Sequence, residues 1–123
     1  MKKFRLFSII ALLVMMLAGA DATAQTLRSS GNSYLGKIER DGTVRSSSNS
    51  YRGKIERDGT IRNSSNSYMG KIESDGTVRN SSNSYMGKVE QDGTVRNSSN
   101  STIGYARGVP MRYAALYFFF NLL

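Results

Sequence analysis

The sequence predicts an all-β fold in which five β-hairpins of a 17-residue repeat surround a central axis, as blades do in a propeller. Three observations lead to this prediction. A segment that starts with Tyr and contains Asp-Gly recurs every 17 residues, from Tyr34, Tyr51, Tyr68 and Tyr85. Its apolar and polar residues alternate, as they do in a half-buried strand. The 123 residues include no Cys, so disulfides cannot replace a packed core.

The first 24 residues have the layout of a secretory signal peptide. Three basic residues lie among the first five, an apolar run covers residues 6–17, and small residues lead up to Ala24. We expect cleavage between Ala24 and Gln25, with a competing site after Ala20. A membrane anchor is the alternative, but the apolar run is shorter than the roughly 20 residues that span a bilayer. The sequence therefore predicts export to the periplasm or the outside of the cell.

Five repeat units fit the chain when they are counted from Thr26. An apolar residue, an Arg, an Asn and a Gly each recur in all five units at intervals of 17 residues. The predicted units are 26–42, 43–59, 60–76, 77–93 and 94–110. Residues 111–123 follow as a tail of different composition. The serine- and asparagine-rich stretches between hairpins have a fixed length, which favours ordered connections over a flexible linker.

Each unit is predicted to form one hairpin closed by a three-residue loop. Residues directly opposite each other in an antiparallel pair point to the same side, and only this loop length puts Ile38 opposite Val44. A type I turn followed by a glycine in the left-handed conformation closes such a loop. The expected turn glycines are Gly42, Gly59, Gly76 and Gly93.

One hairpin of this size is not stable in water, so the five hairpins must share a core. The predicted core residues are Leu27, Ile38, Val44, Ile55, Ile61, Ile72, Val78, Val89 and Val95. The repeated tyrosines fall on the same side of the strand as this core, so we expect them to be buried. Residues 26–28 match a second strand and residues 103–107 match a first strand. We therefore expect these two segments to pair and close the ring, with Leu27 facing Ala106.

Residues 111–123 are predicted to pack against the ring and seal one end of it. They hold three of the five Phe and two of the seven Tyr. Pro110 suits the start of a helix, whereas Tyr117–Phe120 favours a strand, and the sequence does not decide between the two. Contact with a membrane is the alternative role, although the tail is short for a spanning helix.

The composition argues against an enzyme. The chain has neither His nor Cys, and therefore lacks the commonest general base and the thiol nucleophile. Every unit repeats the same acidic pair, such as Glu39 and Asp41, whereas catalysis needs distinct roles at one site. Asp before Gly is typical of turns, and Glu beside Lys is typical of an exposed strand face. We therefore predict no catalytic activity, no metal and no cofactor.

The net charge of +8 falls to +6 if the predicted signal is removed, because three basic residues and one acidic residue are lost. Lys and Glu alternate in each unit, so we do not expect nucleic acid as a partner. Five equivalent arginines are the candidate ligand-binding residues, for an anionic glycan or a lipid head group. They are Arg28, Arg45, Arg62, Arg79 and Arg96. The partner is undetermined, with envelope glycan or another exported protein as the expected classes, and the chain after residue 24 has no predicted membrane-spanning segment.

The four copies of Tyr-x-Gly-Lys-(Ile/Val)-Glu-x-Asp-Gly-Thr-(Val/Ile)-Arg, the signal-like start and the aromatic tail resemble the five-fold β-flower proteins, small exported proteins typical of Bacteroidetes. The resemblance covers essentially all of the chain after residue 24. It implies five β-hairpin petals around an axis and supplies no activity or catalytic residues. The fifth unit departs from the motif, with Thr102 for Tyr, Ala106 for Ile and Val109-Pro110 for Asp-Gly.

These observations together predict an exported, non-enzymatic β-repeat protein that acts as a structural or interaction module. The alternative is a glycan-binding module of the cell envelope that uses the Arg, Asn and Ser side chains at the rims of the petals.

Overall fold

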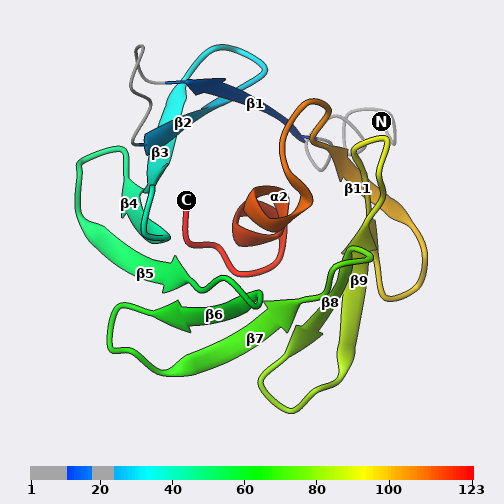
Figure 1. The fold of residues 1–123 in the computed structure, drawn as a ribbon. Coiled ribbons are helices and arrows are strands. Elements are labelled where there is room, and N and C mark those ends of the chain that lie inside the picture. The colour runs from blue at the N-terminus through cyan, green and yellow to red at the C-terminus, as the bar shows by residue number, and fades with distance from the viewer. Residues whose placement is uncertain (1–10, 18–23) are drawn as a thin grey trace, which may run out of the picture.

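The computed structural model describes residues 11–17 and 24–123. The strands in these residues are β1 (Ala11–Leu17), β2 (Ala24–Ser29), β3 (Tyr34–Glu39), β4 (Thr43–Ser46), β5 (Tyr51–Ile55), β6 (Thr60–Asn63), β7 (Tyr68–Ile72), β8 (Thr77–Asn80), β9 (Tyr85–Val89), β10 (Thr94–Asn97) and β11 (Thr102–Tyr105), and the helix is α2 (Met111–Phe118). Strands β2 to β11 are antiparallel neighbours in chain order, and β1 completes a closed sheet. The strands form a ring with α2 inside it (Figure 1). The predicted all-β ring of repeated hairpins is confirmed.

The hairpins β3–β4, β5–β6, β7–β8 and β9–β10, here called petals 1 to 4, have the expected turn. In petal 1, Ile38 lies opposite Val44, as a three-residue loop requires. The Gly42 amide donates to the Glu39 carbonyl at 2.9 Å, and Gly42 has a φ of 93°. A side chain at Gly42 would also overlap the carbonyl oxygen of Ile55 in the next petal. Glycine is therefore required here for both conformation and space.

A β-bulge between successive petals turns the tyrosines outward. Across β4 and β5, Val44 lies opposite Gly53 but Arg45 lies opposite Tyr51, so Arg52 is an extra residue. The extra residue shifts the alternation, and Tyr51 comes to lie on the side of Arg45 instead of the core side. The same shift occurs where β2 meets β3, where β6 meets β7, where β8 meets β9 and where β10 meets β11.

The expectation that the repeated tyrosines are buried is therefore wrong. Tyr51, Tyr68 and Tyr85 are 40–42% exposed. The bulge depends on the glycine two residues after each tyrosine. Gly53 has a φ of 151°, and a β-carbon there would overlap the Arg62 carbonyl oxygen. Leu35, which occupies the extra position in petal 1, packs against the core instead of facing away from it.

The connections between petals are ordered turns. Each contains an asparagine with a positive φ of 67–69°, a conformation that asparagine tolerates better than most residues. After petal 1, for example, the Asn49 amide donates to the Ser46 carbonyl, and the Ser46 amide donates to the Ser50 carbonyl. The connections after β4, β6 and β8 project from the outer edge of the ring (Figure 1).

The core lies inside the ring. All nine residues predicted for it are at most 4% exposed. They form one cluster with Ala106 and with Ala114, Ala115 and Leu116 of helix α2. The cluster is continuous around the ring because each unit contributes the same two apolar positions, as a five-hairpin arrangement requires.

The tail is helical in its first half. Pro110 immediately precedes the helix, where a missing N–H breaks no helical hydrogen bond. Ala114 and Ala115 are strong helix formers, and both are completely buried together with Leu116. Their small side chains let the helix lie close to the surrounding strands. The aromatic run did not become a strand because the ring leaves no open edge for it beside α2.

After α2, the chain passes along the inside of several petals. Asn121, with a φ of 56°, turns the chain, and the Leu122 amide donates to the Leu116 carbonyl at 3.0 Å. Three tail side chains each lie against the bulge glycine of a different petal: Phe119 against Gly87, Phe120 against Gly70 and Leu123 against Gly36. In petal 2, Arg52 donates to the Asn121 carbonyl at 3.0 Å. The tail therefore connects petals 1 to 4 from within.

In the full chain, the ring closes through a strand that the prediction does not include. Strand β1 lies between β2 and β11, antiparallel to β2 and parallel to β11, so Leu27 does not pair with Ala106. The predicted pairing concerns a chain without residues 1–24, whereas in the full chain residues 11–17 occupy the place between the two segments. The basic start and the competing cleavage site after Ala20 lie outside the described residues.

Candidate functional site

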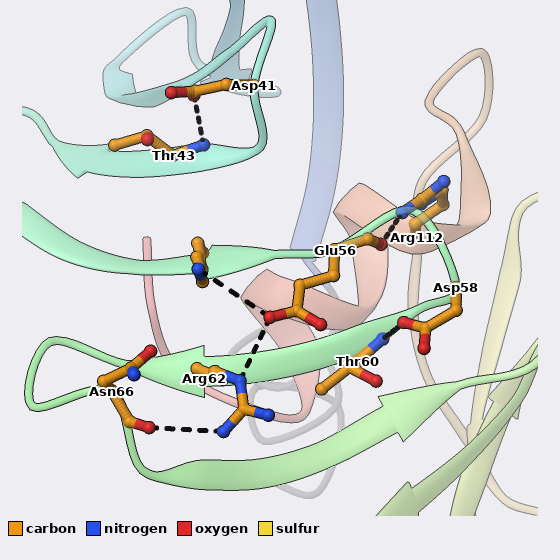
Figure 2. A network of polar contacts seen from close by, with 9 residues as sticks. Asp41, Thr43, Glu56, Asp58, Thr60, Arg62, Asn66 and Arg112 are labelled. Atoms are coloured by element: carbon orange, nitrogen blue, oxygen red, sulfur yellow. Dashed lines mark hydrogen bonds and ion pairs between the residues drawn. The ribbon is translucent and has the colours of Figure 1, made fainter.

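The repeated arginines belong to a polar network within each petal. In petal 2, Arg62 Nε lies 3.1 Å from Glu56 Oε2, and Lys54 Nζ lies 3.7 Å from the same oxygen. Arg62 Nη1 also donates to the Asn66 carbonyl at 3.3 Å (Figure 2). The Arg62 side chain is 32% exposed. One guanidinium thus joins both strands of the petal to the connection that follows.

The same network recurs in petals 1, 3 and 4, with Arg–Glu distances of 3.0–3.1 Å. Arg28 differs because the residue six positions before it is Ala22 instead of Glu. It donates to the Asn32 carbonyl at 3.2 Å and lies 5.5 Å from the centre of the Tyr34 ring. The five arginines predicted as a ligand site are therefore not gathered at one place. Each stabilises its own part of the ring.

The aspartates hold the turns. Asp58 Oδ1 accepts a hydrogen bond from the Thr60 amide at 3.0 Å, and Asp41 does the same with Thr43 at 2.9 Å (Figure 2). These backbone hydrogen bonds, followed by bonds from the threonine hydroxyls, hold the pKa of both carboxyls below the usual value. Asp75 and Asp92 make equivalent bonds at 2.9 Å. The four aspartates therefore remain ionised as turn residues.

The outward tyrosines and their cross-strand arginines form a repeated surface, here called the Tyr–Arg surface. Its pairs are Tyr34 with Arg28, Tyr51 with Arg45, Tyr68 with Arg62 and Tyr85 with Arg79. Arg45, Arg62 and Arg79 are held in place by the glutamates of their petals, and Arg28 donates to the Asn32 carbonyl. Three of the four tyrosine rings are substantially exposed. The ring therefore presents aromatic side chains at equivalent positions on successive petals.

Two neighbouring clefts lie at the Asp-Gly turns, where the turns approach the start of α2. One, of about 310 Å³, is lined by residues 57–59 and 72–74 with Met111 and Arg112. The other, of about 330 Å³, is lined by residues 39–42 with Ile55, Arg57, Arg112 and Tyr113. Arg57 and Arg112 line both clefts. We refer to the two together as the turn cleft.

Within residues 11–17 and 24–123, no three or more acidic side chains converge in a way that could hold a metal ion. No helix in this part of the chain combines the length and the apolar character that crossing a membrane requires.

The fold and the network define a class of repeat protein: hairpins of one sequence motif, each stabilised internally, arranged as petals around a helix formed by the chain's own C-terminus. A family model described as 5-fold beta-flower protein matches residues 18–122, and the chain belongs to that family. Comparison with curated proteins and with solved structures finds no significant match.

Three features of the ring were not predicted from the sequence. The bulge glycines were visible as a Gly in the middle of every first strand, which is a signal for a bulge. The asparagines with a positive φ appear in the sequence as an Asn that recurs every 17 residues. From this recurrence we predicted that the connections are ordered, but not their backbone conformation. The turn cleft has no repeated signal, because Arg112 comes from the tail and Arg40 and Arg57 occupy a position that other units fill with Ser, Gln or Gly.

Proposed function

We propose that the protein is an exported, non-enzymatic interaction module that binds its partner through the Tyr–Arg surface. The exposure of Tyr51, Tyr68 and Tyr85 is the observation that carries this proposal. None of these rings belongs to the core cluster or packs against it, so the core does not explain their outward repetition. Exposed aromatic residues at regular positions are typical of binding surfaces.

The state of the acidic residues supports a non-enzymatic role. Each Glu of petals 1 to 4 is paired with an Arg and a Lys, and each Asp of an Asp-Gly turn accepts a threonine amide. The same arrangement recurs in four petals without a specialised copy. A scaffold explains this repetition, whereas an acid–base site would need two carboxyls in different environments.

A glycan is the second, more specific candidate, and the tyrosines favour it. Sugar rings stack on exposed aromatic faces, and the Ser and Asn side chains of the connections offer hydrogen bonds beside them. Weak contacts on successive petals would add through multivalency when one polymer touches several of them. The arginines contribute less than the sequence alone indicated, because two of their donor groups are already engaged within each petal.

The test compares a variant with all three exposed tyrosines changed to Ser and a variant with the same residues changed to Phe. We expect wild-type protein and the Phe variant to bind a glycan array or to sediment with peptidoglycan, and the Ser variant to lose most binding. Equal binding by the Ser variant would remove the Tyr–Arg surface from the proposal. Export is tested separately by the N-terminal sequence of the mature protein, which should begin at Gln25.

A further inference from the structure

The residues that break the repeat gather at the turn cleft. The first loop residue of each hairpin is Arg40 in petal 1 and Arg57 in petal 2, but Ser74 and Gln91 in petals 3 and 4. All four loops make the same turn hydrogen bond from glycine to glutamate at 2.9 Å. The turn therefore does not need arginine at this position, and the two arginines are free to serve another purpose.

A third arginine reaches the same place from the tail. Arg112, in the first turn of α2, donates to the backbone carbonyl of Glu56, which fixes its guanidinium beside petal 2 (Figure 2). Its Nε atom is buried and has no hydrogen-bond partner among the described residues. An unpaired buried donor on a cation is costly, and a negative charge bound in the adjoining clefts, which Arg112 lines, would offset part of that cost.

The charges of the cleft favour an anion. In the part of the chain that the structure describes, no ion pair reaches Arg40, Arg57 or Arg112, since the ion pairs there all lie within the petals. The lining residues Glu39 and Glu73 are neutralised by their petal arginines and lysines. Asp41 and Asp58 each keep a negative charge, which offsets two of the three arginines and leaves one unit of positive charge.

From this geometry we propose that the turn cleft binds an acidic sugar residue, one that carries a carboxylate or a sulfate. The arginines suit a planar or tetrahedral oxyanion because a guanidinium can donate two parallel hydrogen bonds to it. Tyr113, Met111 and Ile72 supply an apolar wall, and the free lone pairs of Asp41 and Asp58 accept sugar hydroxyls. Each cleft is of the size that holds a group as large as one sugar ring.

This inference adds a ligand class to the proposed binding role but uses a different surface, so the two can fail separately. The probe is a tetramer of galacturonic acid, titrated into the full chain and followed by calorimetry, with its methyl ester as the neutral comparison. We expect saturable binding of the acid and at least tenfold weaker binding of the ester.

The variants use residues that other petals already accept. Arg40→Ser gives petal 1 the residue that petal 3 has at Ser74. Arg57→Gln gives petal 2 the residue that petal 4 has at Gln91, so both variants should keep the fold. We expect each to weaken binding about tenfold, the size of one lost charge-assisted interaction. Arg52→Met removes one positive charge outside the cleft and introduces the residue of petals 3 and 4, and it should change binding less than twofold.

No binding of the acid at millimolar concentration would overturn the proposal. Equal losses in Arg57→Gln and Arg52→Met would also overturn it, because net charge alone would then explain binding. Equal binding of acid and ester would show that the acidic group is not recognised. Replacement of the three exposed tyrosines by Ser should leave this binding unchanged, and a loss there would assign the acid to the Tyr–Arg surface.

Discussion

At the scale of single residues, glycines have two different structural roles in each petal. The turn glycines close the hairpins, and the bulge glycines turn the tyrosines outward. The turn could be predicted because Asp-Gly and the alternation on either side of it are local signals. The bulge was missed because alternation alone gives a consistent strand, and the cost of a β-carbon arises only against the neighbouring strand.

The bulge glycines give the sharpest prediction at this scale. Gly70→Ala should lower the free energy of unfolding by about 2 kcal/mol or more, because the residue has a φ of 149° and its β-carbon would overlap the Arg79 carbonyl oxygen. Urea unfolding measures the loss. Gly31→Ser is the matched control, since the other connections carry Ser at this position, and it should change stability by less than about 0.5 kcal/mol. A neutral Gly70→Ala would mean that the bulge is absent.

The turn aspartates predict how stability depends on acid. Their pKa values are lowered in the folded state by the threonine amides, so their contribution is present above the unfolded value near 3.8 and is lost as the pH falls through the folded value. A variant with Asp41, Asp58, Asp75 and Asp92 changed to Asn keeps an acceptor oxygen but does not titrate there. Below pH 4, its unfolding free energy should fall less steeply than that of the wild type. Unfolding free energies from urea titrations at several pH values measure this difference. If they fall with pH equally steeply in both proteins, the aspartates do not contribute to the acid dependence.

At the scale of elements, helix α2 is the part that the repeats do not supply. Each petal contributes two modest apolar residues, and the space between the petals is filled by Ala114, Ala115 and Leu116. The sequence indicated that the tail seals the ring but not whether it is helix or strand, because the aromatic run and the alanines favour opposite outcomes. The closed ring decides between them, since a helix alone satisfies its backbone groups without a sheet edge.

The helix can be tested through its most buried large side chain. Leu116→Ala should destabilise the protein by about 3 kcal/mol, because the removed atoms leave a cavity that the surrounding strands fill only in part. Thermal unfolding followed by circular dichroism measures the change. Leu35→Ala removes the same atoms from a half-buried position and should cost about half as much. If both substitutions cost the same, Leu116 does not lie in the shared core.

At the scale of the whole molecule, the closure of the ring depends on whether residues 1–24 are present. In the full chain, β1 separates β2 from β11. If residues 1–24 are removed, as the signal-like sequence predicts, the two strands lose this neighbour. In petal 1, Lys37 lies directly opposite Arg45. Tyr105 and Arg28 are the equivalent residues of β11 and β2, so we expect them to become direct cross-strand partners.

A cysteine pair can report this exchange, because the chain has no cysteine of its own. Arg28→Cys with Tyr105→Cys should form a disulfide in a chain that begins at Gln25, where the two strands are neighbours. It should not form one in the full chain, where an intervening strand and an offset of two residues along it put the two residues about 12 Å apart, beyond the reach of a disulfide. Mass spectrometry under oxidising conditions distinguishes the two. A disulfide in the full chain, or none in the shorter one, would show that removal of β1 does not bring β2 and β11 together.

The C-terminal tail lies inside a closed ring of petals and touches several of them (Figure 1). Nuclear Overhauser effects measure this most directly, because the ring protons of Phe119 and Phe120 and the methyl groups of Leu123 lie against Gly87, Gly70 and Gly36 respectively. We predict cross-peaks from each of these side chains to the α-protons of its own glycine, all three in one folded species. If the tail side chains show no cross-peaks to these glycines while the petals keep their cross-strand pairs, the tail lies outside the ring and does not join the petals.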